Sequence, residues 1–506
     1  MKPGSRKNGR PLHKHGSIGI IRYMNPETHI PRDIRNMSIY FVGIKGTGMS
    51  ALAELMLRGG ASVTGSDTSE HFYTDEVLKS LKIPYFEGFK AENLPTNVDF
   101  LVHSAAYNPD NHPELLEAKR RGVPIIEYTK ALGDLSRDIH ATGVAGVHGK
   151  TTTTALIGTI VKDLGLPGSV LVGSAVRGFD NRATYYNGDR FFVAETCEYR
   201  RHFLAFHPDQ LVVTTVDVDH LDYFRDYSDI ESAFMEYTRK LPSRGRLVYC
   251  SDDPGAADLA VAVKQERRDL CLVPYGTSAD GEFRIVGSSL ESGRQRMRLA
   301  AWDGDIFLKV PGHHTLLNAA GAVAAAAGLY DELNRELDEA EFEQIATSLE
   351  GFSGSKRRSE LLGTAAGVLF VDDYGHHPRE IRTTLQGFRE FYPDRRIIID
   401  FMSHTYTRTQ ALLDDFATAF TDADVVILHK IYASARETSA LVDGRTLYRK
   451  VQEHHPQVYY FQEVDEAAGF LSDFFQDGDL FITMGAGENW RLGAQLYHDM
   501  SGEERI

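Results

Sequence analysis

The chain has 506 residues, more than one hydrophobic core normally organises, so about two to four domains are expected. Its hydrophobic fraction of 42% and charged fraction of 25% are those of a globular protein, and 55 Lys plus Arg against 71 Asp plus Glu give a formal net charge of -16. An acidic chain repels polyanions, which excludes a nucleic-acid scaffold and requires glycine loops, buried cations or metal ions wherever phosphates bind.

Cysteine content and hydropathy constrain the compartment. The three cysteines, Cys197, Cys250 and Cys271, are sparse and odd in number, which favours a reducing compartment, and we expect a cytoplasmic protein. No run of about 18 apolar residues exists, so membrane insertion is not expected. Residues 1–37 are rich in Lys and Arg, and their apolar stretch at 18–21 is too short for the core of a signal peptide. We predict a disordered basic tail, and the alternative is an arm that binds phosphate or a partner.

From Ser38 on, short apolar segments alternate with amphipathic segments of helix length. In the first set, strands are predicted at 38–44, 61–67, 98–106 and 124–128, and helices at 49–58 and 113–121. Such alternation is typical of βαβ units that build a parallel sheet.

Two further sets follow along the chain. In the second, strands are predicted at 139–146, 191–196, 211–216 and 246–250, helices at 150–164, 229–241 and 319–329, and hairpins within 283–310. In the third, which starts near Phe352, strands are predicted at 367–374, 395–401, 424–430 and 479–485, with helices between them. We therefore predict an α/β protein of three domains in series, each with a mainly parallel sheet flanked by helices.

The segment GVHGKTTTT, residues 146–154, is the strongest local indication of phosphate binding. It follows a predicted strand and opens a helix, so its glycines would let backbone N–H groups curl around phosphate oxygens at a helix N-terminus. Lys150 would add charge at the β- and γ-phosphates, and the Thr151 hydroxyl would reach a Mg²⁺ ion. The full Walker pattern is not met, since Val144 stands at its first glycine, and the alternative interpretation is a glycine-rich helix cap.

Glu195 and His220 are candidates for the metal side of this loop. Glu195 ends the apolar strand FFVA, and His220 lies just beyond the next strand in DVDHLDYF. Strand ends of an open α/β sheet point into its crevice, so both side chains are expected beside Thr151. The alternatives are a surface glutamate and a histidine that is simply hydrogen-bonded.

The first glycine loop in chain order, GIKGTGMSALA at 43–53, satisfies G-x-G-x-x-A directly after a strand, with Asp67 about 20 residues further on. This is the pattern of a dinucleotide-binding loop. Its physical content is a diphosphate on a helix N-terminus and an acid at a ribose hydroxyl, and a UDP-sugar supplies both groups as well as NAD does. The alternative is a glycine turn without a ligand.

The third domain carries VDDYGHHPRE at 371–380 and SHTYTRT at 403–409, both at predicted strand ends. Acids, histidines and an arginine at this edge suit a crevice for a charged small molecule. Arg408 is able to bind a carboxylate or phosphate through two nitrogens. The alternative is a solvated loop with a helix cap.

Together these motifs resemble those of the Mur ligase family. In chain order they are the Gly46/Gly48 loop, GVHGKTTTT, Glu195, DHLDYF, GHHTLLNAAGA, KRRSE, DDYGHHP and HTYTRT. The resemblance runs from about residue 38 to the C-terminus. It implies a Rossmann-like UDP-sugar-binding domain at 38–137, a P-loop ATPase-like central domain at 138–351 that binds ATP, and a Rossmann-like amino-acid-binding domain at 352–506.

The resemblance also implies roles for individual residues. Catalytic roles fall to Lys150, Glu195 and His220, with Thr151, Glu195 and His220 holding Mg²⁺ or Mn²⁺. The implied ATP-binding positions are Gly146, His148, Gly149, Lys150, Thr151, Thr152, His314, Asn318, Arg357 and Arg358. The UDP-sugar positions are Gly43, Gly46, Thr47, Gly48, Asp67, His103 and Ser104, and the positions on the amino-acid side are His376, His377, His404 and Arg408.

The activity implied is ATP-dependent joining of a UDP-sugar carboxylate to an amine through an acyl-phosphate, in peptidoglycan precursor synthesis. The residues YTRT at 406–409 favour a member that joins L-alanine to UDP-N-acetylmuramate. The alternative within the family is a recycling ligase that adds a murein tripeptide to the same UDP-sugar. The implied partners are these small molecules and ATP, without nucleic acid, in a monomer or a homodimer.

Three positions depart from the family pattern. The run after Glu195, TCEYRRHFL at 196–204, lacks the usual density of acids and serines, His313 stands where an arginine is common, and Lys45 occupies a loop position that is usually small. The first two leave the acceptor environment open, and the third leaves the diphosphate contacts open.

Two functions outside the family remain as alternatives. A NAD-dependent dehydrogenase would use the first glycine loop but would leave the second loop and the third domain unexplained. A non-catalytic ATP-binding switch would require a glutamine-type water-positioning motif, which we do not identify.

Overall fold

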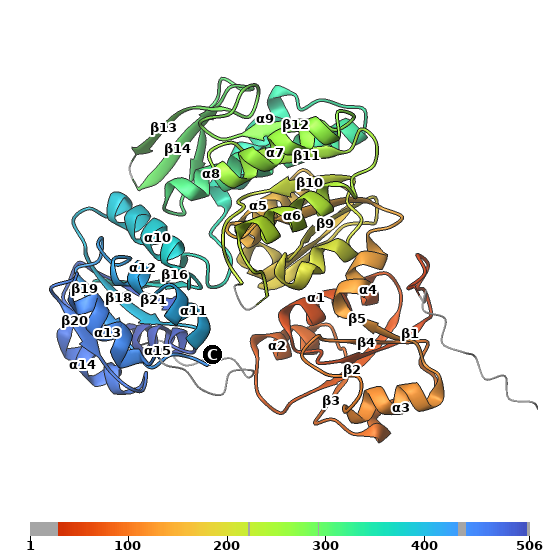
Figure 1. The fold of residues 1–506 in the computed structure, drawn as a ribbon, viewed down its shortest axis with the longest axis horizontal. Helices are drawn as coiled ribbons and strands as arrows, with labels where there is room; N and C mark the ends of the chain where they lie inside the picture. Colours follow the sequence, from red (N-terminus) through yellow and green to blue (C-terminus); the bar gives the residue numbers. More distant parts are fainter. Residues whose placement is uncertain (1–28, 221–222, 292, 434–441, 503–506) are drawn as a thin grey trace, which may run out of the picture.

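The computed structural model describes residues 29–220, 223–291, 293–433 and 442–502. It contains three α/β domains that follow one another along the chain (Figure 1). Each domain is built on a mainly parallel sheet covered by helices, so the predicted fold class is confirmed.

The N-terminal domain holds a five-stranded parallel sheet in the order β3-β2-β1-β4-β5. Its central strand β1 is an apolar run that is almost wholly buried, as expected when helices cover both faces of a parallel sheet. The elements are β1 (Ser38–Val42), α1 (Thr47–Arg58), β2 (Ser62–Asp67), α2 (Tyr73–Ser80), β3 (Tyr85–Glu87), β4 (Phe100–His103), α3 (Pro113–Arg121), β5 (Ile125–Glu127) and α4 (Tyr128–Leu135).

Part of the predicted tail belongs to the N-terminal domain. Residues 1–28 lie outside the described part of the chain, but residues 29–37 pack on the N-terminal domain. Ile30 and Ile34 are buried in its apolar core, and the Asp134 carboxylate accepts a hydrogen bond from the Ile30 backbone N–H at 2.9 Å. The first domain therefore begins before Ser38. Two isolated isoleucines form no periodic pattern, which is why the sequence did not indicate this segment.

The central domain holds a seven-stranded sheet in the order β12-β11-β10-β6-β9-β7-β8, in which only β8 runs antiparallel to its neighbour. The predicted hairpins form a separate antiparallel sheet, β13-β14-β15. The elements are β6 (His140–Ala145), α5 (Lys150–Asp163), β7 (Gly168–Val176), β8 (Arg182–Tyr186), β9 (Phe191–Glu195), β10 (Gln210–Val213), α6 (Tyr227–Thr238), β11 (Arg246–Cys250), α7 (Pro254–Glu266), β12 (Cys271–Tyr275), β13 (Ile285–Glu291), β14 (Arg294–Leu299), β15 (Ile306–Leu308), α8 (His313–Glu332) and α9 (Glu339–Gly351).

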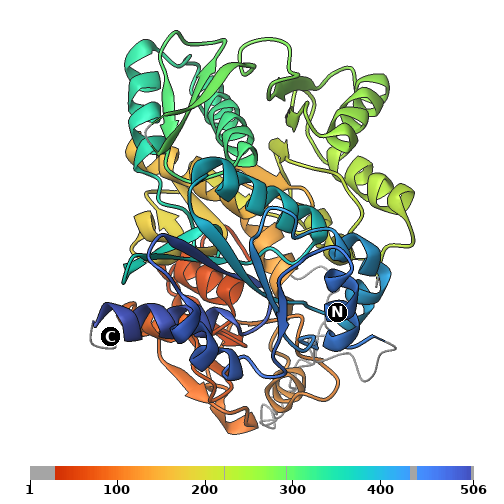
Figure 2. The ribbon, with the colours of Figure 1, turned by 90° about the vertical axis from the view of Figure 1, so that its left-hand side faces the viewer.

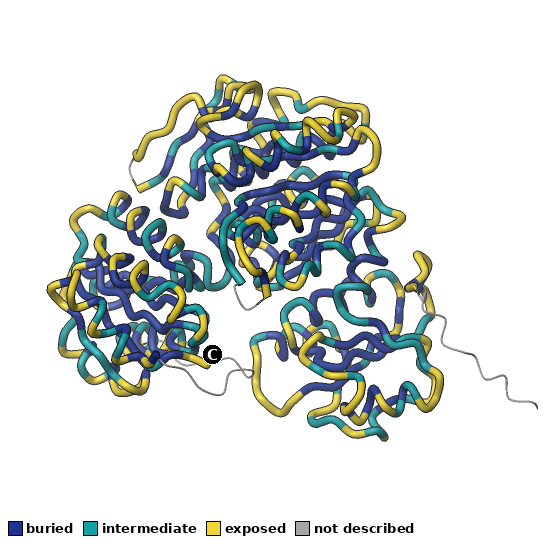
Figure 3. The backbone as a smooth tube through the Cα atoms, in the orientation of Figure 1, coloured by how far each residue is buried: buried dark blue, intermediate teal, exposed yellow. Residues whose placement is uncertain are grey.

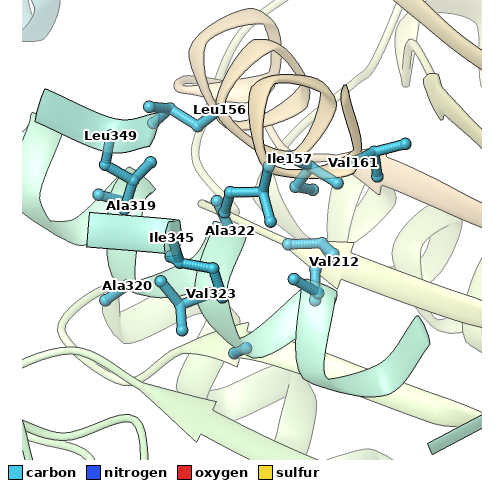
Figure 4. Packing of buried hydrophobic residues seen from close by; sticks show 14 of the residues in the cluster. Leu156, Ile157, Val161, Val212, Ala319, Ala320, Ala322, Val323, Ile345 and Leu349 are labelled. Atoms are coloured by element: carbon cyan, nitrogen blue, oxygen red, sulfur yellow. The ribbon is translucent and has the colours of Figure 1, made fainter. Parts of the chain in front are cut away.

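The largest apolar core of the described residues lies beneath α5, α8 and α9 of this domain. Figure 4 shows Ile157 and Val161 of α5 close to Ala322 of α8, with Ile345 of α9 on the same cluster. The alanine-rich face of α8 lets α5 approach closely, since interaxial distance depends on side-chain size. This packing holds the helix that carries the phosphate loop firmly against its sheet.

The C-terminal domain holds a six-stranded sheet in the order β16-β17-β21-β18-β19-β20, with only β16 antiparallel. All of β21 is buried. The elements are β16 (Glu360–Ala365), β17 (Val368–Asp373), α10 (Pro378–Phe391), β18 (Arg396–Met402), α11 (Tyr406–Ala411), α12 (Leu413–Ala417), β19 (Val425–Leu428), α13 (Gly444–Gln452), β20 (Val458–Tyr460), α14 (Glu466–Phe474), β21 (Asp479–Gly485) and α15 (Trp490–Ser501).

Several observed elements were not predicted, among them the helices α2, α4, α7 and α9 and the internal strand β7. The strands β3, β8, β12, β16 and β20 were not predicted either, and each of them ends a sheet. An edge strand is covered less completely, so it lacks the continuous apolar run that marked the central strands. Helix α8 begins at His313 rather than at Ala319, so the segment HHTLLN also lies on this helix.

The C-terminal domain lies against the central domain through α10. The backbone at Gly387 on α10 comes so close to Gly312, at the start of α8, that a Cβ on Gly387 would lie 2.6 Å from the Gly312 Cα. Figure 2 shows this domain in front of the central one, and Figure 3 shows the buried sheets enclosed by more exposed helices and loops. Among the described residues, none of the helices combines the length and apolarity required to cross a bilayer.

Replacing Val161 with Ala tests the importance of the packing between α5 and α8. Val161 is fully buried, so removing two carbons and leaving a cavity is expected to lower the free energy of unfolding by about 2 kcal/mol. Val261→Ala on α7 is the matched control, because Val261 is 58% exposed on another helix. Equal effects of the two substitutions in urea denaturation of the central domain would contradict this account.

Candidate functional site

The sheet order of the central domain brings the candidate active-site segments together. Strand β6 lies between β10 and β9, all three are parallel, and their carboxyl ends therefore meet at one edge. The phosphate loop follows β6, Glu195 ends β9, and the DVDH segment at 217–220 follows β10.

Two glycines of the phosphate loop are required by its geometry. Gly146 has φ +139°, and a Cβ there would lie 2.1 Å from the Thr214 Oγ1. Gly149 has φ +82°, and a Cβ there would lie 2.7 Å from the Asn318 Oδ1. The backbone of the loop is thus held against β10 on one side and against α8 on the other, with the N-terminus of α5 open toward a ligand.

Lys150 lies inside the loop and has a carboxylate partner that the sequence analysis did not single out. Its Nζ donates to the carbonyl oxygens of Gly146 and Val147 and lies 2.9 Å from Glu198, whose side chain is only 2% exposed. Burial alone would lower the pKa of Lys150, but the nearby charges, that of Glu198 foremost, together with the hydrogen bond to Glu198 raise it. Burial would likewise raise the pKa of Glu198, but Lys150 and His220 lower it. Both groups are therefore charged at neutral pH.

Thr151 and Glu195 meet as predicted. The Thr151 hydroxyl donates to Glu195 Oε1 at 3.0 Å, and Glu195 Oε2 accepts the Gly173 N–H at 2.7 Å. His220 lies on the other carboxylate, with its Nε2 3.4 Å from Glu198 Oε1. Mg²⁺ is usually held by one or two carboxylates together with substrate phosphates, and a hydroxyl beside Glu195 at the phosphate loop fits that donor set. The assignment of Thr151, Glu195 and His220 to a metal remains a prediction.

A cavity of about 560 Å³ opens between the phosphate loop, α8 and α10, and we call it the nucleotide cavity. Its lining includes the predicted ATP-binding residues His148, Gly149, Thr152, His314, Asn318 and Arg358. Burial lowers the pKa of His314 to about 4, so its ring is neutral at pH 7. The neutral His314 ring and the Asn318 amide on this wall suit the base of a nucleotide.

Arg357 is the predicted ATP-binding residue that the structure places elsewhere. Its guanidinium donates to Asp372 at 3.0 Å and to the carbonyl oxygen of Gly485 at 2.7 Å, which ties the linker to the C-terminal sheet. Only the neighbouring Arg358 lines the nucleotide cavity. The two adjacent arginines lie at a turn, where Arg357 has φ +59°, and the sequence does not indicate which one faces the cavity.

A second cavity, of about 330 Å³, lies between the first glycine loop and the central domain, and we call it the seam cavity. Gly46, Thr47, Gly48 and Ser104 line it from the N-terminal domain, and Glu195 lines it from the central domain. The pair Thr151–Glu195 therefore stands between the phosphate loop and a space that reaches the N-terminus of α1.

The remaining residues predicted for the UDP-sugar lie in or next to the first glycine loop. The Asp67 carboxylate accepts the Lys45 N–H at 2.6 Å, His103 is buried, and Gly43 has φ +83°. The Lys45 side chain is buried beside Asp75, with Nζ and Oδ1 3.0 Å apart. The charge of Lys45 is thus paired with a carboxylate of its own domain.

The C-terminal residues predicted for the amino-acid side converge at the start of α10 and α11. The rings of His376 and His404 lie 6.3 Å apart, and burial lowers the pKa of His376 to about 4. The ring of His377 lies 5.3 Å from that of His148 in the phosphate loop. Arg408 donates to Asp219 of the central domain at 3.2 Å.

Four polar contacts join α10 and α11 to the central domain. Arg379 lies 2.5 Å from Asp217 and 3.2 Å from Asp253, His148 lies 3.0 Å from Glu380, and Arg408 contacts Asp219. We call Arg379, Glu380 and Arg408 with these partners the interdomain contacts. Sequence analysis placed Arg408 only on the substrate side and did not single out Asp217, Asp219 or Arg379, because pairing between distant segments leaves no local pattern.

Comparison with known proteins agrees with this geometry. Three family models match the chain: "Mur ligase family, catalytic domain" over residues 38–140, "Mur ligase middle domain" over 144–326 and "Mur ligase, glutamate ligase domain" over 357–487. The UDP-N-acetylmuramate–L-alanine ligase of Treponema pallidum is 47% identical over 470 residues, covering 93% of this chain and 98% of that protein. The chain belongs to the Mur ligase family. Ligases of this family use ATP.

Other relatives cover the chain equally well. The enzyme of the same name from Borreliella burgdorferi is 39% identical, covering 91% of this chain and 98% of that protein. The crystal structure of UDP-N-acetylmuramate-alanine ligase from Thermotoga maritima matches with a TM-score of 0.75 and 26% identity over 93% of this chain and all of that one. A murein peptide ligase from Psychrobacter arcticus shares the fold, with a TM-score of 0.62 and 22% identity over 93% of this chain and all of that one.

Replacing Glu198 with Gln tests its role as partner of Lys150. Removing one member of a buried ion pair leaves the other charge uncompensated, so the ligand-free protein is expected to lose about 3–5 kcal/mol of stability. A non-hydrolysable ATP analogue should then raise the thermal midpoint more in the variant than in the wild type, because phosphates replace the missing negative charge. Glu343→Gln, at an exposed position on α9, is the control. An unchanged ligand-free midpoint in Glu198→Gln would refute this role.

Replacing Arg379 with Ala tests the interdomain contacts. Losing a partly exposed ion pair costs about 1 kcal/mol, which shifts an equilibrium between closed and open arrangements about fivefold toward the open one. Small-angle scattering at low salt should report a larger radius of gyration, and added salt should move the wild type in the same direction. Arg382→Ala on the same helix is the control, since Arg382 contacts only Asp415 and Thr418 within its own domain. An identical radius in both variants would contradict the assignment.

Proposed function

We propose that this chain is an ATP-dependent ligase that joins L-alanine to the carboxylate of UDP-N-acetylmuramate in peptidoglycan precursor synthesis. The observation that carries the proposal is the pair Thr151–Glu195, which stands where the phosphate loop adjoins the seam cavity. A γ-phosphate on the loop and a carboxylate entering from the first glycine loop would meet there. The relatives that span almost the whole chain carry the name of this activity.

The chemistry proceeds in two steps. A carboxylate oxygen of the muramate attacks the γ-phosphorus, the bond to the β-phosphate oxygen breaks, and an acyl-phosphate and ADP form. The alanine amine then attacks the acyl carbon, loses a proton, and phosphate leaves from the tetrahedral intermediate. The first step brings like charges together, so cations and N–H donors must neutralise charge where it accumulates.

The residues of the central domain supply this neutralisation. Lys150 is charged and fixed inside the loop, and the N-terminus of α5 presents backbone N–H groups beside it. Thr151 and Glu195, with His220 nearby, would hold Mg²⁺, which supplies positive charge to the phosphates when it is bound. Gly146, His148, Gly149 and Thr152 would enclose the phosphates, and His314, Asn318 and Arg358 the rest of the nucleotide.

The C-terminal domain would bind the amino acid at His376, His377, His404 and Arg408 and exclude water from the acyl-phosphate. The interdomain contacts hold α10 and α11 on the central domain, which is the arrangement that such exclusion requires. A cytoplasmic location belongs to the proposal, because free cysteines and ATP both fit a reducing compartment.

The recycling ligase that adds a murein tripeptide is the second candidate. The murein peptide ligase fold is shared, but the nearly full-length relatives at 47% and 39% identity carry the L-alanine ligase name. A NAD-dependent dehydrogenase would leave the phosphate loop, Lys150 and Glu195 without a role.

Phosphate release from ATP and Mg²⁺ tests the proposal directly. UDP-N-acetylmuramate is supplied with L-alanine or, separately, with the L-Ala-γ-D-Glu-diaminopimelate tripeptide, and product masses are measured. Turnover that requires both UDP-N-acetylmuramate and L-alanine, with an alanine-sized mass gain, supports the proposal. Turnover with the tripeptide alone assigns the chain to the recycling branch, and turnover with neither overturns both assignments.

Replacing Lys150 with Ala separates the two binding sites. Ligation is expected to fall by at least about 100-fold, because the charge that meets the phosphates is lost. Calorimetric binding of UDP-N-acetylmuramate should stay within about twofold of the wild type, since the two glycine loops lie on different domains. Loss of UDP-sugar binding in this variant would contradict the assignment of Lys150 to the ATP phosphates.

A further inference from the structure

Tyr128 lies at the interface between the N-terminal and central domains, and the site described above gives it no role. It is the first residue of α4, the helix that leads from the N-terminal domain into the central one. Its side chain packs against the apolar cores of both domains. A ring held from two sides cannot swing freely, so the direction of its hydroxyl is set by the fold.

The Tyr128 hydroxyl is directed at the first glycine loop. A Cβ on Gly48 would lie 2.7 Å from this oxygen and 2.8 Å from the ring carbon that bears it. Gly48 therefore has no side chain because the tyrosine stands over it, in the first turn of α1. Tyr128 and Gly48 both line the seam cavity, together with Glu195 and Cys197.

This hydroxyl has no hydrogen-bond partner among the described residues, unlike other tyrosines of the N-terminal domain. Tyr73 donates to Thr47 Oγ1 at 3.1 Å, Tyr85 donates to Asp75 at 2.5 Å, and Tyr40 donates to Glu114 at 3.3 Å. Tyr128 is partly exposed on the wall of the seam cavity, so a ligand in that cavity is able to supply the missing partner.

The electrostatics of the cavity make this hydroxyl a donor. Burial raises the pKa of Tyr128, and the charge of the Glu195 carboxylate raises it further. The phenol therefore keeps its proton at neutral pH. What it lacks is an acceptor oxygen, and the N-terminus of α1 beside it favours an acceptor with negative charge.

We infer that the Tyr128 hydroxyl donates a hydrogen bond to an oxygen of the nucleotide sugar, either a diphosphate oxygen or a sugar oxygen next to it. This inference rests on the proposed function, because it takes the ligand of the seam cavity to be a UDP-sugar. A nucleotide sugar with its diphosphate on α1 and its carboxylate near Glu195 must pass Gly48 and therefore Tyr128. The tyrosine thus lies between the diphosphate site and the reacting carboxylate and would help to position the ligand along this path.

Tyr128→Phe tests the inference, because it keeps the ring between the two cores and removes only the donor. Without ATP, the calorimetric Kd of UDP-N-acetylmuramate is expected to rise about tenfold, as for a lost hydrogen bond to a charged or polar acceptor, with an unchanged thermal midpoint. The Kd of a non-hydrolysable ATP analogue should stay within about twofold, since the nucleotide cavity is separate. In turnover the KM for UDP-N-acetylmuramate should rise while the KM for ATP does not.

Binding of UDP alone distinguishes the two acceptors. A tenfold loss for UDP as well assigns the acceptor to the diphosphate, and a loss only for UDP-N-acetylmuramate assigns it to the sugar. Tyr186→Phe, at the exposed last residue of β8, is the matched control and should change neither Kd.

The inference and the proposed function fail in different ways. Wild-type protein that binds UDP-N-acetylmuramate and turns over, with the same affinity in Tyr128→Phe, overturns the inference alone. Wild-type protein that does not bind UDP-N-acetylmuramate overturns the proposed function, and the inference with it. A lower thermal midpoint in Tyr128→Phe without any change in affinity also overturns the inference, since it assigns the hydroxyl a purely structural part.

Discussion

A buried positive charge in the phosphate loop is the constraint on which the rest of the site depends. Lys150 must remain charged to meet phosphate, and a charge removed from water requires a partner. Glu198 is that partner in the ligand-free arrangement, and it also contacts His220. The loop that follows Glu195 therefore does more than connect two elements, because it brings a second carboxylate to the phosphate site and leaves Glu195 for Thr151.

The same edge of the central sheet also carries ion pairs to the C-terminal domain. Asp217 and Asp219 alternate along the segment after β10, and each meets an arginine of the C-terminal domain. His220 follows Asp219 directly in the left-handed region, with φ +54°, a conformation that costs a non-glycine residue free energy. Interdomain pairing and the placement of His220 are thus coupled through one short segment, so that the arrangement of the domains bears on the geometry around Glu198.

The two cavities lie at different domain interfaces. The nucleotide cavity lies between the central and C-terminal domains, whereas the seam cavity lies between the N-terminal and central domains. Glu195 and the phosphate loop stand between them. Two substrates can therefore approach one reaction point from opposite sides, and each domain interface closes around one of them.

The sequence by itself determined the fold class and the loops, and only the tertiary structure decided which side chains meet. Central strands, the phosphate loop and Gly46 to Gly48 follow from local patterns, because backbone conformation and strand burial are encoded by neighbouring residues. Thr151 meeting Glu195 followed from the rule that parallel strand ends share an edge. The contacts of Glu198 and Asp219, the position of Tyr128, the bonding of Arg357 to the C-terminal sheet and the burial of Ile30 depend on segments far apart in the chain. Their approach is set by packing rather than by any local pattern.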